Sequence, residues 1–169
     1  MAVAAQHTTL DPEVSARKVL DILWNGVFPV DPVVIAKQLG LRVITGPLPE
    51  DISGVLVKRS GQDPAIILNE RDSRNRQRFT CAHEIGHYIY RLETDGDHYE
   101  YIDRRDTLSA RGVNEEEIFA NRFAAALLMP EDEVRVLAEG GEPRYLMAIY
   151  FGVSDDAMRF RLKNLGLNG

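Results

Sequence analysis

Residues 79–88 read Phe-Thr-Cys-Ala-His-Glu-Ile-Gly-His-Tyr, and this stretch predicts a buried helix that carries reactive side chains. His83 and His87 are four residues apart, so a helix places both imidazoles on one face. Two neutral imidazoles in that position can hold one Zn²⁺ at about 2.0–2.1 Å each. Glu84 follows the first histidine directly, so it projects beside the metal and can accept a proton from a water molecule there. The pentapeptide therefore predicts two metal ligands and a catalytic base.

The alternative interpretation of this motif is a surface helix with an ordinary pair of histidines one turn apart. Histidine is scarce in the chain, which contains only His7, His83, His87 and His98. Apolar and small residues flank the motif on both sides, which favours a helix that is buried nearly all round. Buried imidazole and carboxylate groups need partners, and a metal ion would provide one for all three side chains.

The composition is that of one compact globular domain. The chain has 169 residues, of which 44% are hydrophobic and 27% charged. Its net charge of −6 argues against a general affinity for nucleic acid, and no apolar run reaches the ~18–20 residues of a membrane span. Residues 1–9 lack the basic start and apolar segment of a signal peptide. Cys81 is the only cysteine, which excludes an intrachain disulfide. We therefore expect a cytoplasmic protein, with Cys81 as a small core residue.

The apolar pattern predicts an α+β fold with a small, mainly antiparallel sheet and helices packed on it. Asp11-Pro12 and Asp31-Pro32 are typical helix starts, with aspartate as the N-cap and proline in the first turn. Further helices are expected at residues 73–92, 115–128, 146–151 and 155–165. Strands are expected at residues 41–45, 53–58 and 65–68, and the last two should form a hairpin.

Two polar stretches flank the histidine motif. The arginines that lead into it are expected to form a solvated face, with a patch for an acidic substrate or partner as the sharper alternative; they are Arg71, Arg74, Arg76 and Arg78. Residues 94–113 are polar and weakly periodic, so they are expected to lack regular structure and to act as a lid or binding loop. We expect an edge strand from residues 53–68 to hold an extended substrate chain beside the motif.

A catalytic zinc site needs a third protein ligand. The helix expected at residues 115–128 carries Glu117 and Asn121 on one face that is otherwise apolar. Glu117 is therefore a candidate ligand, and Asn121 could accept a hydrogen bond from the far nitrogen of a ligand imidazole. The alternative is a capping box, in which Asn114 caps the helix and Glu117 reaches back to it. A capping glutamate cannot also reach a metal, and the spacing alone leaves both interpretations open.

Two blocks of the sequence resemble the ImmA/IrrE family of zinc-dependent peptidases. The first block is residues 79–88. The second reads Glu-Ile-Phe-Ala-Asn-Arg-Phe-Ala-Ala-Ala-Leu-Leu-Met-Pro at residues 117–130, similar to that family's E-x-x-A-N-x-F-A-x-x-L-L-M-P signature. Weaker similarity at residues 31–40 and 151–162 extends the resemblance over most of the chain. Ile118-Phe119 replaces a more polar pair that is often found there, which leaves the ligand pattern intact.

The resemblance implies a zincin-like fold in which His83, His87 and Glu117 bind the metal and Glu84 is the catalytic base. Zn²⁺ is the expected metal, with Mn²⁺ as an alternative. Members of the family typically cleave a helix-turn-helix repressor, or act as partners in phage immunity, mobile-element and toxin–antitoxin systems. We expect a flexible tail over residues 1–10 and a single metallopeptidase domain over residues 11–169, with a helical subregion at residues 131–169.

The residue that would stabilise an oxyanion is left open among several candidates near the motif. They are His98, Tyr88 and Tyr99, with Tyr90 and Tyr101 as further choices. Two rival functions also stay open: a non-catalytic partner that holds a repressor or antitoxin, and a DNA-binding regulator that uses the two helices around residues 152–154. Glu84 opposes the first, because a structural metal site has no use for a base. The seven acidic and five basic residues of 131–169 oppose the second.

Overall fold

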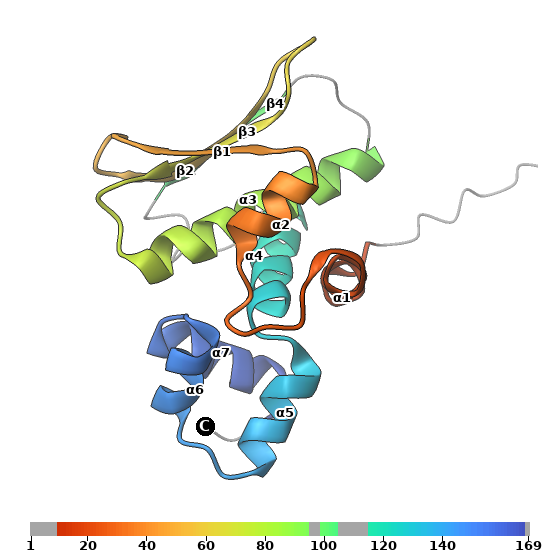
Figure 1. Ribbon diagram of the computed structural model, residues 1–169, viewed down its shortest axis with the longest axis vertical. Helices are drawn as coiled ribbons and strands as arrows, with labels where there is room; N and C mark the ends of the chain where they lie inside the picture. Colours follow the sequence, from red (N-terminus) through yellow and green to blue (C-terminus); the bar gives the residue numbers. More distant parts are fainter. Residues whose placement is uncertain (1–9, 95–98, 105–114, 168–169) are drawn as a thin grey trace, which may run out of the picture.

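A four-stranded sheet covers one side of the long helix α3, and α4 packs on the opposite side (Figure 1). The computed structural model describes residues 10–94, 99–104 and 115–167. Its helices are α1 (Pro12–Leu23), α2 (Pro32–Gln38), α3 (Arg74–Thr94), α4 (Glu115–Leu128), α5 (Glu131–Glu139), α6 (Arg144–Phe151) and α7 (Asp155–Asn164). Its strands are β1 (Arg42–Gly46), β2 (Ile52–Lys58), β3 (Ala65–Asn69) and β4 (Tyr99–Arg104). The predicted zincin-like α+β class is confirmed.

The sheet has the strand order β1-β3-β2-β4. The hairpin of β2 and β3 is antiparallel as predicted, β2 also pairs antiparallel with β4, and β1 pairs parallel with β3. Both strands of the hairpin are interior, so the expectation that residues 53–68 supply an edge strand is wrong. The edges of the sheet are β1, beside β3, and β4, beside β2, and β4 lies inside the stretch expected to lack regular structure. Tyr99, Tyr101 and Ile102 favour a strand, but this short run lies within a polar stretch and was not predicted.

The Asp-Pro pairs start helices as predicted. The Asp11 carboxylate accepts hydrogen bonds from the backbone N–H groups of Glu13 and Val14 at the start of α1. Asp31 does the same for Val33 and Val34 at the start of α2. Each carboxylate satisfies N–H groups that have no partner within the helix. None of the helices among the described residues combines the length and hydrophobicity of a membrane-spanning segment.

Helices α3 and α4 approach each other unusually closely at Gly86. A Cβ atom on Gly86 would lie 2.8 Å from Cα and 3.1 Å from the carbonyl oxygen of Ala120. Only glycine facing alanine allows this separation, because any larger side chain would push the helices apart. The contact lies inside a fully buried core that includes Ile85, Phe123 and Leu127, and Cys81 is also fully buried, as predicted. The histidine helix is therefore held directly against α4.

Arg78 joins three parts of the fold and corrects the prediction of a solvated arginine face. Its guanidinium donates hydrogen bonds to the carbonyl oxygens of Val30 at 2.7 Å, Gly152 at 3.0 Å and Phe151 at 3.2 Å. Arg74 is exposed, as expected for a solvated face. The sequence could not distinguish the two, because the carbonyl groups that Arg78 binds come from distant segments.

Helices α6 and α7 form the predicted pair around a tight turn. Gly152 adopts the left-handed conformation with φ 65°, which ends α6, and the Ser154 hydroxyl caps α7. Arg161 of α7 is 3% exposed and donates a hydrogen bond to the Met129 carbonyl at 3.0 Å. It also forms an ion pair with Glu13 of α1. These contacts bind the C-terminal helices to the rest of the fold.

Candidate metal centre

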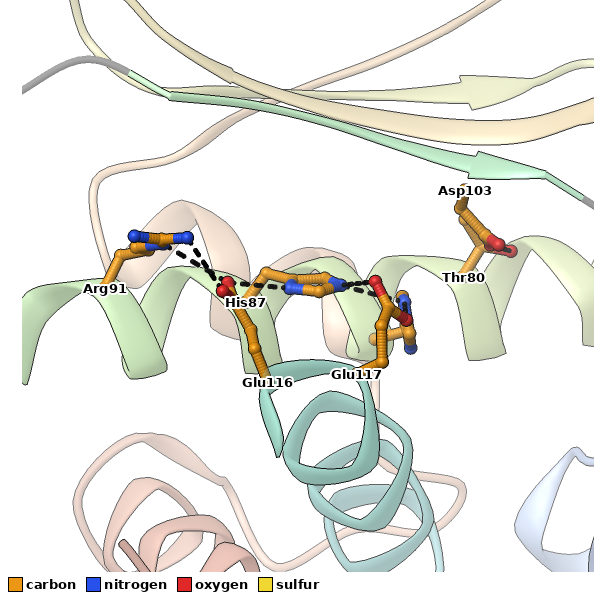
Figure 2. Close-up of polar contacts among 7 residues, drawn as sticks. Thr80, His87, Arg91, Asp103, Glu116 and Glu117 are labelled. Atoms are coloured by element: carbon orange, nitrogen blue, oxygen red, sulfur yellow. Dashed lines mark hydrogen bonds and ion pairs between the residues drawn. The ribbon is translucent and has the colours of Figure 1, made fainter. Parts of the chain in front are cut away.

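Three potential metal-binding atoms converge between α3 and α4. His83 and His87 project from successive turns of α3, and their Nε2 atoms are 3.1 Å apart. The carboxylate of Glu117 on α4 lies 3.1 Å from Nε2 of His87 and 3.5 Å from Nε2 of His83. One potential ligand atom from each residue falls within a single 4.8 Å cluster. Both Glu117 oxygens face the imidazoles, so its side chain points at the histidines rather than back along its own helix, as Figure 2 shows.

Glu116 orients the ring of His87, and this partner was not predicted from the sequence. Nδ1 of His87 donates to Oε1 of Glu116 at 3.0 Å, and Arg91 donates to both oxygens of the same carboxylate at 2.8 and 3.3 Å (Figure 2). A carboxylate on the far nitrogen fixes the tautomer of a metal-binding histidine and raises the basicity of the other nitrogen. The only sequence signal was the run of three glutamates at residues 115–117, which also suits a helix N-terminus.

The cluster fits a cation better than it fits neutral groups alone. With the proton of His87 on Nδ1, its Nε2 lone pair faces both a carboxylate and the Nε2 atom of His83, which is unfavourable without positive charge between them. Despite the opposing effect of burial, hydrogen bonds that the ring donates to Glu116 and Glu117 raise the pKa of His87 to about 9, so without a metal ion the ring itself carries the positive charge. Burial lowers the pKa of His83 to about 3, so this ring stays neutral, as a metal ligand must. Two imidazoles and one carboxylate are also a donor set that suits zinc.

Glu84 is fully buried, and neither carboxylate oxygen has a hydrogen-bond partner among the described residues. Burial raises its pKa to about 8, and the nearby Asp103 and Glu117 contribute in the same direction. Gly54 of β2 lets the sheet approach this part of α3 closely, since a Cβ atom there would collide with the Thr80 methyl group, while Oε1 of Glu84 would be in ordinary contact at 3.7 Å. An unpaired buried carboxylate is costly, so its presence beside a ligand cluster points to chemistry rather than stability.

A second buried carboxylate, Asp103, lies between the sheet and α3. Its side chain accepts a long hydrogen bond of 3.4 Å from the Thr80 hydroxyl, one helical turn before Glu84 (Figure 2). Burial raises the pKa of Asp103 to about 6, while the guanidinium of Arg76 acts in the opposite direction. Arg76 itself donates to the Ser53 hydroxyl at 3.2 Å. Arg76 is therefore also part of a buried polar layer, contrary to the predicted solvated face.

The contacts of the other predicted site residues within the described part of the chain do not assign them a role. Burial lowers the pKa of His83, and the Asn121 side chain acts in the opposite direction, so its amide lies beside that ring. Nδ1 of His83, however, has no hydrogen-bond partner among the described residues. The outer-shell role of Asn121 stays a prediction. Tyr88 and Tyr99 are partly buried and pack against the hydrophobic core, and their roles as oxyanion stabilisers are likewise untested. His98 lies outside the described residues.

A family model described as Peptidase_M78, the IrrE N-terminal-like domain, matches residues 36–163 of the chain. The match covers about three quarters of the sequence and includes both site-bearing helices. The chain belongs to this family. The IrrE-like assignment agrees with the resemblance seen in the two sequence blocks. No curated protein matches the sequence.

The IrrE-like domain also has a structural counterpart among solved proteins. A structure described as a Mycobacterium tuberculosis transcriptional regulator superposes with a TM-score of 0.62 at 20% sequence identity. The superposition covers 90% of this chain and 46% of that chain, so the chain spans about half the length of the solved protein. At this identity the likeness shows a shared fold.

Proposed function

We propose that the protein is a metal-dependent endopeptidase that uses zinc, with manganese as the alternative metal. Membership of a peptidase family supports hydrolysis of peptide bonds. The single observation that carries the proposal is Glu84, which is buried without a hydrogen-bond partner beside the His83, His87 and Glu117 cluster. A purely structural metal site would need the three ligands but not this carboxylate.

In this proposal His83, His87 and Glu117 hold the metal, and Glu116 keeps His87 in the orientation that ligation requires. Bound zinc would polarise the scissile carbonyl and lower the pKa of a nearby water molecule. Glu84 takes the proton of the attacking water and later passes it to the amine nitrogen that leaves. Glu84 ionises more readily when positive charge lies in the neighbouring cluster, which offsets the effect of its burial.

The substrate we propose is a regulatory protein, such as a helix-turn-helix repressor or an antitoxin-like partner. This part of the proposal rests on what the family resemblance implies. The direct experiment incubates zinc-loaded protein with the repressor encoded beside its gene, with and without a chelator. Glu84→Gln is the matched control, because glutamine keeps the size of the side chain but cannot accept the proton. We expect cleavage by the wild type alone, with equal zinc in both proteins by elemental analysis. Cleavage at the wild-type rate by the glutamine variant would overturn the assignment.

Two non-enzymatic functions are weaker alternatives. A DNA-binding role for α6 and α7 has support from the name of the solved relative, but two of the three basic residues of α7 are already paired with carboxylates. Arg161 is buried against Glu13, and Arg159 pairs with Asp156 at 3.2 Å. A gel-shift assay at physiological salt tests this function. A purely binding partner of a repressor or antitoxin would hold it without cleavage, and the same incubation would reveal a stable complex.

A further inference from the structure

A cleft of about 840 Å³ starts beside the ligand cluster and is closed at its far side by α7. Its walls come from the start of α3, the middle and end of α4, the turn at residues 153–154 and α7. The lining includes Arg76, Phe79, Asn121, Arg122, Ala125 and Phe160. A second cleft of about 750 Å³ lies between α1 and α5, but none of the candidate site residues lines it.

The cleft continues the reactive faces of both helices. On α3, Phe79 lies one turn before His83, and on α4, Asn121 and Ala125 lie one and two turns after Glu117. Residues four apart on a helix share a face, so the floor of the cleft lies along the same helix faces as the ligand residues, starting one turn away from them. Two turns cover about 11 Å, which corresponds to roughly three residues of an extended peptide.

The lining combines apolar surface with positive charge. Phe160 of α7 is 52% exposed despite its size, and Phe79 and Ala125 add apolar surface on the other walls. Arg122 is exposed, and no hydrogen bond or ion pair engages it among the described residues. Arg76 also lines the cleft, and its Nη2 atom is buried without a partner.

The acidic group on the lining is already neutralised. Asp156 pairs with Arg159, and the buried Arg161 at the base of the cleft pairs with Glu13 of α1. Arg76 faces the buried Asp103, so the uncompensated charge of the cleft is positive and comes from Arg122. A segment that fills it should bring a negative charge next to an apolar side chain.

We propose that this cleft binds the substrate polypeptide on one side of the bond to be cleaved, and that it selects an apolar residue beside an acidic one. The inference rests on the proposed peptidase function and adds the substrate class. Phe79 and Phe160 contact the apolar side chain, and Arg122 pairs with the acidic residue. Helix α7 thereby serves as the end wall of a substrate cleft.

Binding is tested on the zinc-loaded Glu84→Gln protein, which should hold peptides without cleaving them. Fluorescence anisotropy compares two labelled peptides of equal length, one alternating leucine with glutamate and one alternating leucine with lysine. We expect the acidic peptide to bind at least about tenfold more tightly. Adding Arg122→Glu should reverse this preference, and adding Phe160→Ala should weaken both peptides. Lys163→Glu is the matched control, since it makes the same charge change on exposed α7 surface outside the cleft.

Cleavage is tested separately with the wild type and a peptide library prepared by digesting a bacterial lysate. Mass spectrometry of the products should show aspartate or glutamate enriched next to leucine, phenylalanine or methionine near the cut, and Arg122→Glu should remove that enrichment. Binding with the expected preference but no cleavage would support the cleft and overturn the peptidase function. Cleavage with a pattern that Arg122→Glu and Phe160→Ala leave unchanged would overturn the cleft proposal alone. Equal binding of both peptides would also overturn it.

Discussion

Replacement of Gly86 by alanine should damage the metal centre without touching any ligand. The added methyl group would lie 2.8 Å from Cα of Ala120, whereas ordinary contacts begin near 3.4 Å, so α4 must retreat by about 0.6 Å. Glu117 moves with α4, while His83 and His87 stay on α3. Metal–ligand distances tolerate only about 0.2 Å, so we expect zinc affinity to fall at least about tenfold. Competition with a chromophoric zinc chelator measures this change.

Gly86→Ala should change the free energy of unfolding through two opposing effects. Overpacking at a close helix contact costs about 1–3 kcal/mol, and alanine in a helix interior gains about 1 kcal/mol over glycine. We therefore expect a net loss of about 1 kcal/mol in the free energy of unfolding of the metal-free protein, measured in urea. Gly46→Ala is the control, because a Cβ atom there meets nothing within 4 Å. Wild-type zinc affinity in the Gly86→Ala variant, or an equal loss in the control, would refute this reasoning.

Three further predictions concern the buried polar groups. Glu116→Ala should lower zinc affinity by about 10–100-fold because the His87 ring loses its orienting acceptor, whereas Glu115→Ala on the exposed side of the same turn should have little effect in the same competition assay. Arg78→Met should reduce the free energy of unfolding by about 2–4 kcal/mol because three carbonyl groups lose their donor; calorimetry should show no such loss for Arg74→Met. Burial raises the pKa of Glu84 from 4.5 to about 8, so in the metal-free protein its contribution to stability is complete below pH 4.5 and declines as the pH rises to 8. The stability of wild type relative to Glu84→Gln should therefore fall across that range in urea titrations, and a constant difference would contradict the raised pKa.

The sequence predicted those features that depend on neighbours along the chain. The Asp-Pro helix starts form because aspartate caps the N–H groups of its own first turn, and the β2–β3 hairpin forms between adjacent strands. The arrangement of His83 and His87 needs only the period of one helix. The buried surroundings of that helix were also predictable, because its flanking residues are apolar.

The sequence did not predict features that require two distant segments to meet. The edge strand β4 pairs with β2, and its short run of strand-forming residues, Tyr99, Tyr101 and Ile102, is too brief within a polar stretch to predict a strand. Arg78 is partly buried because its partners come from α6 and from the segment before α2. Asp103 becomes a neighbour of Glu84 only when the sheet covers α3. Each of these outcomes depends on packing rather than local preference.

Glu117, the third potential ligand, shows most clearly which features followed from the sequence and which depended on tertiary packing. Spacing alone allowed Glu117 either to cap its own helix or to face the histidines, because both are within reach of a glutamate at that position. The close contact of Gly86 with Ala120 brings α4 against α3 and directs Glu117 to the imidazoles, and it places Glu116 on the far nitrogen of His87. The sequence therefore determined the two-histidine half of the centre through helix geometry. The acidic half, and the cleft that extends from it, were decided only by the tertiary packing of the two helices.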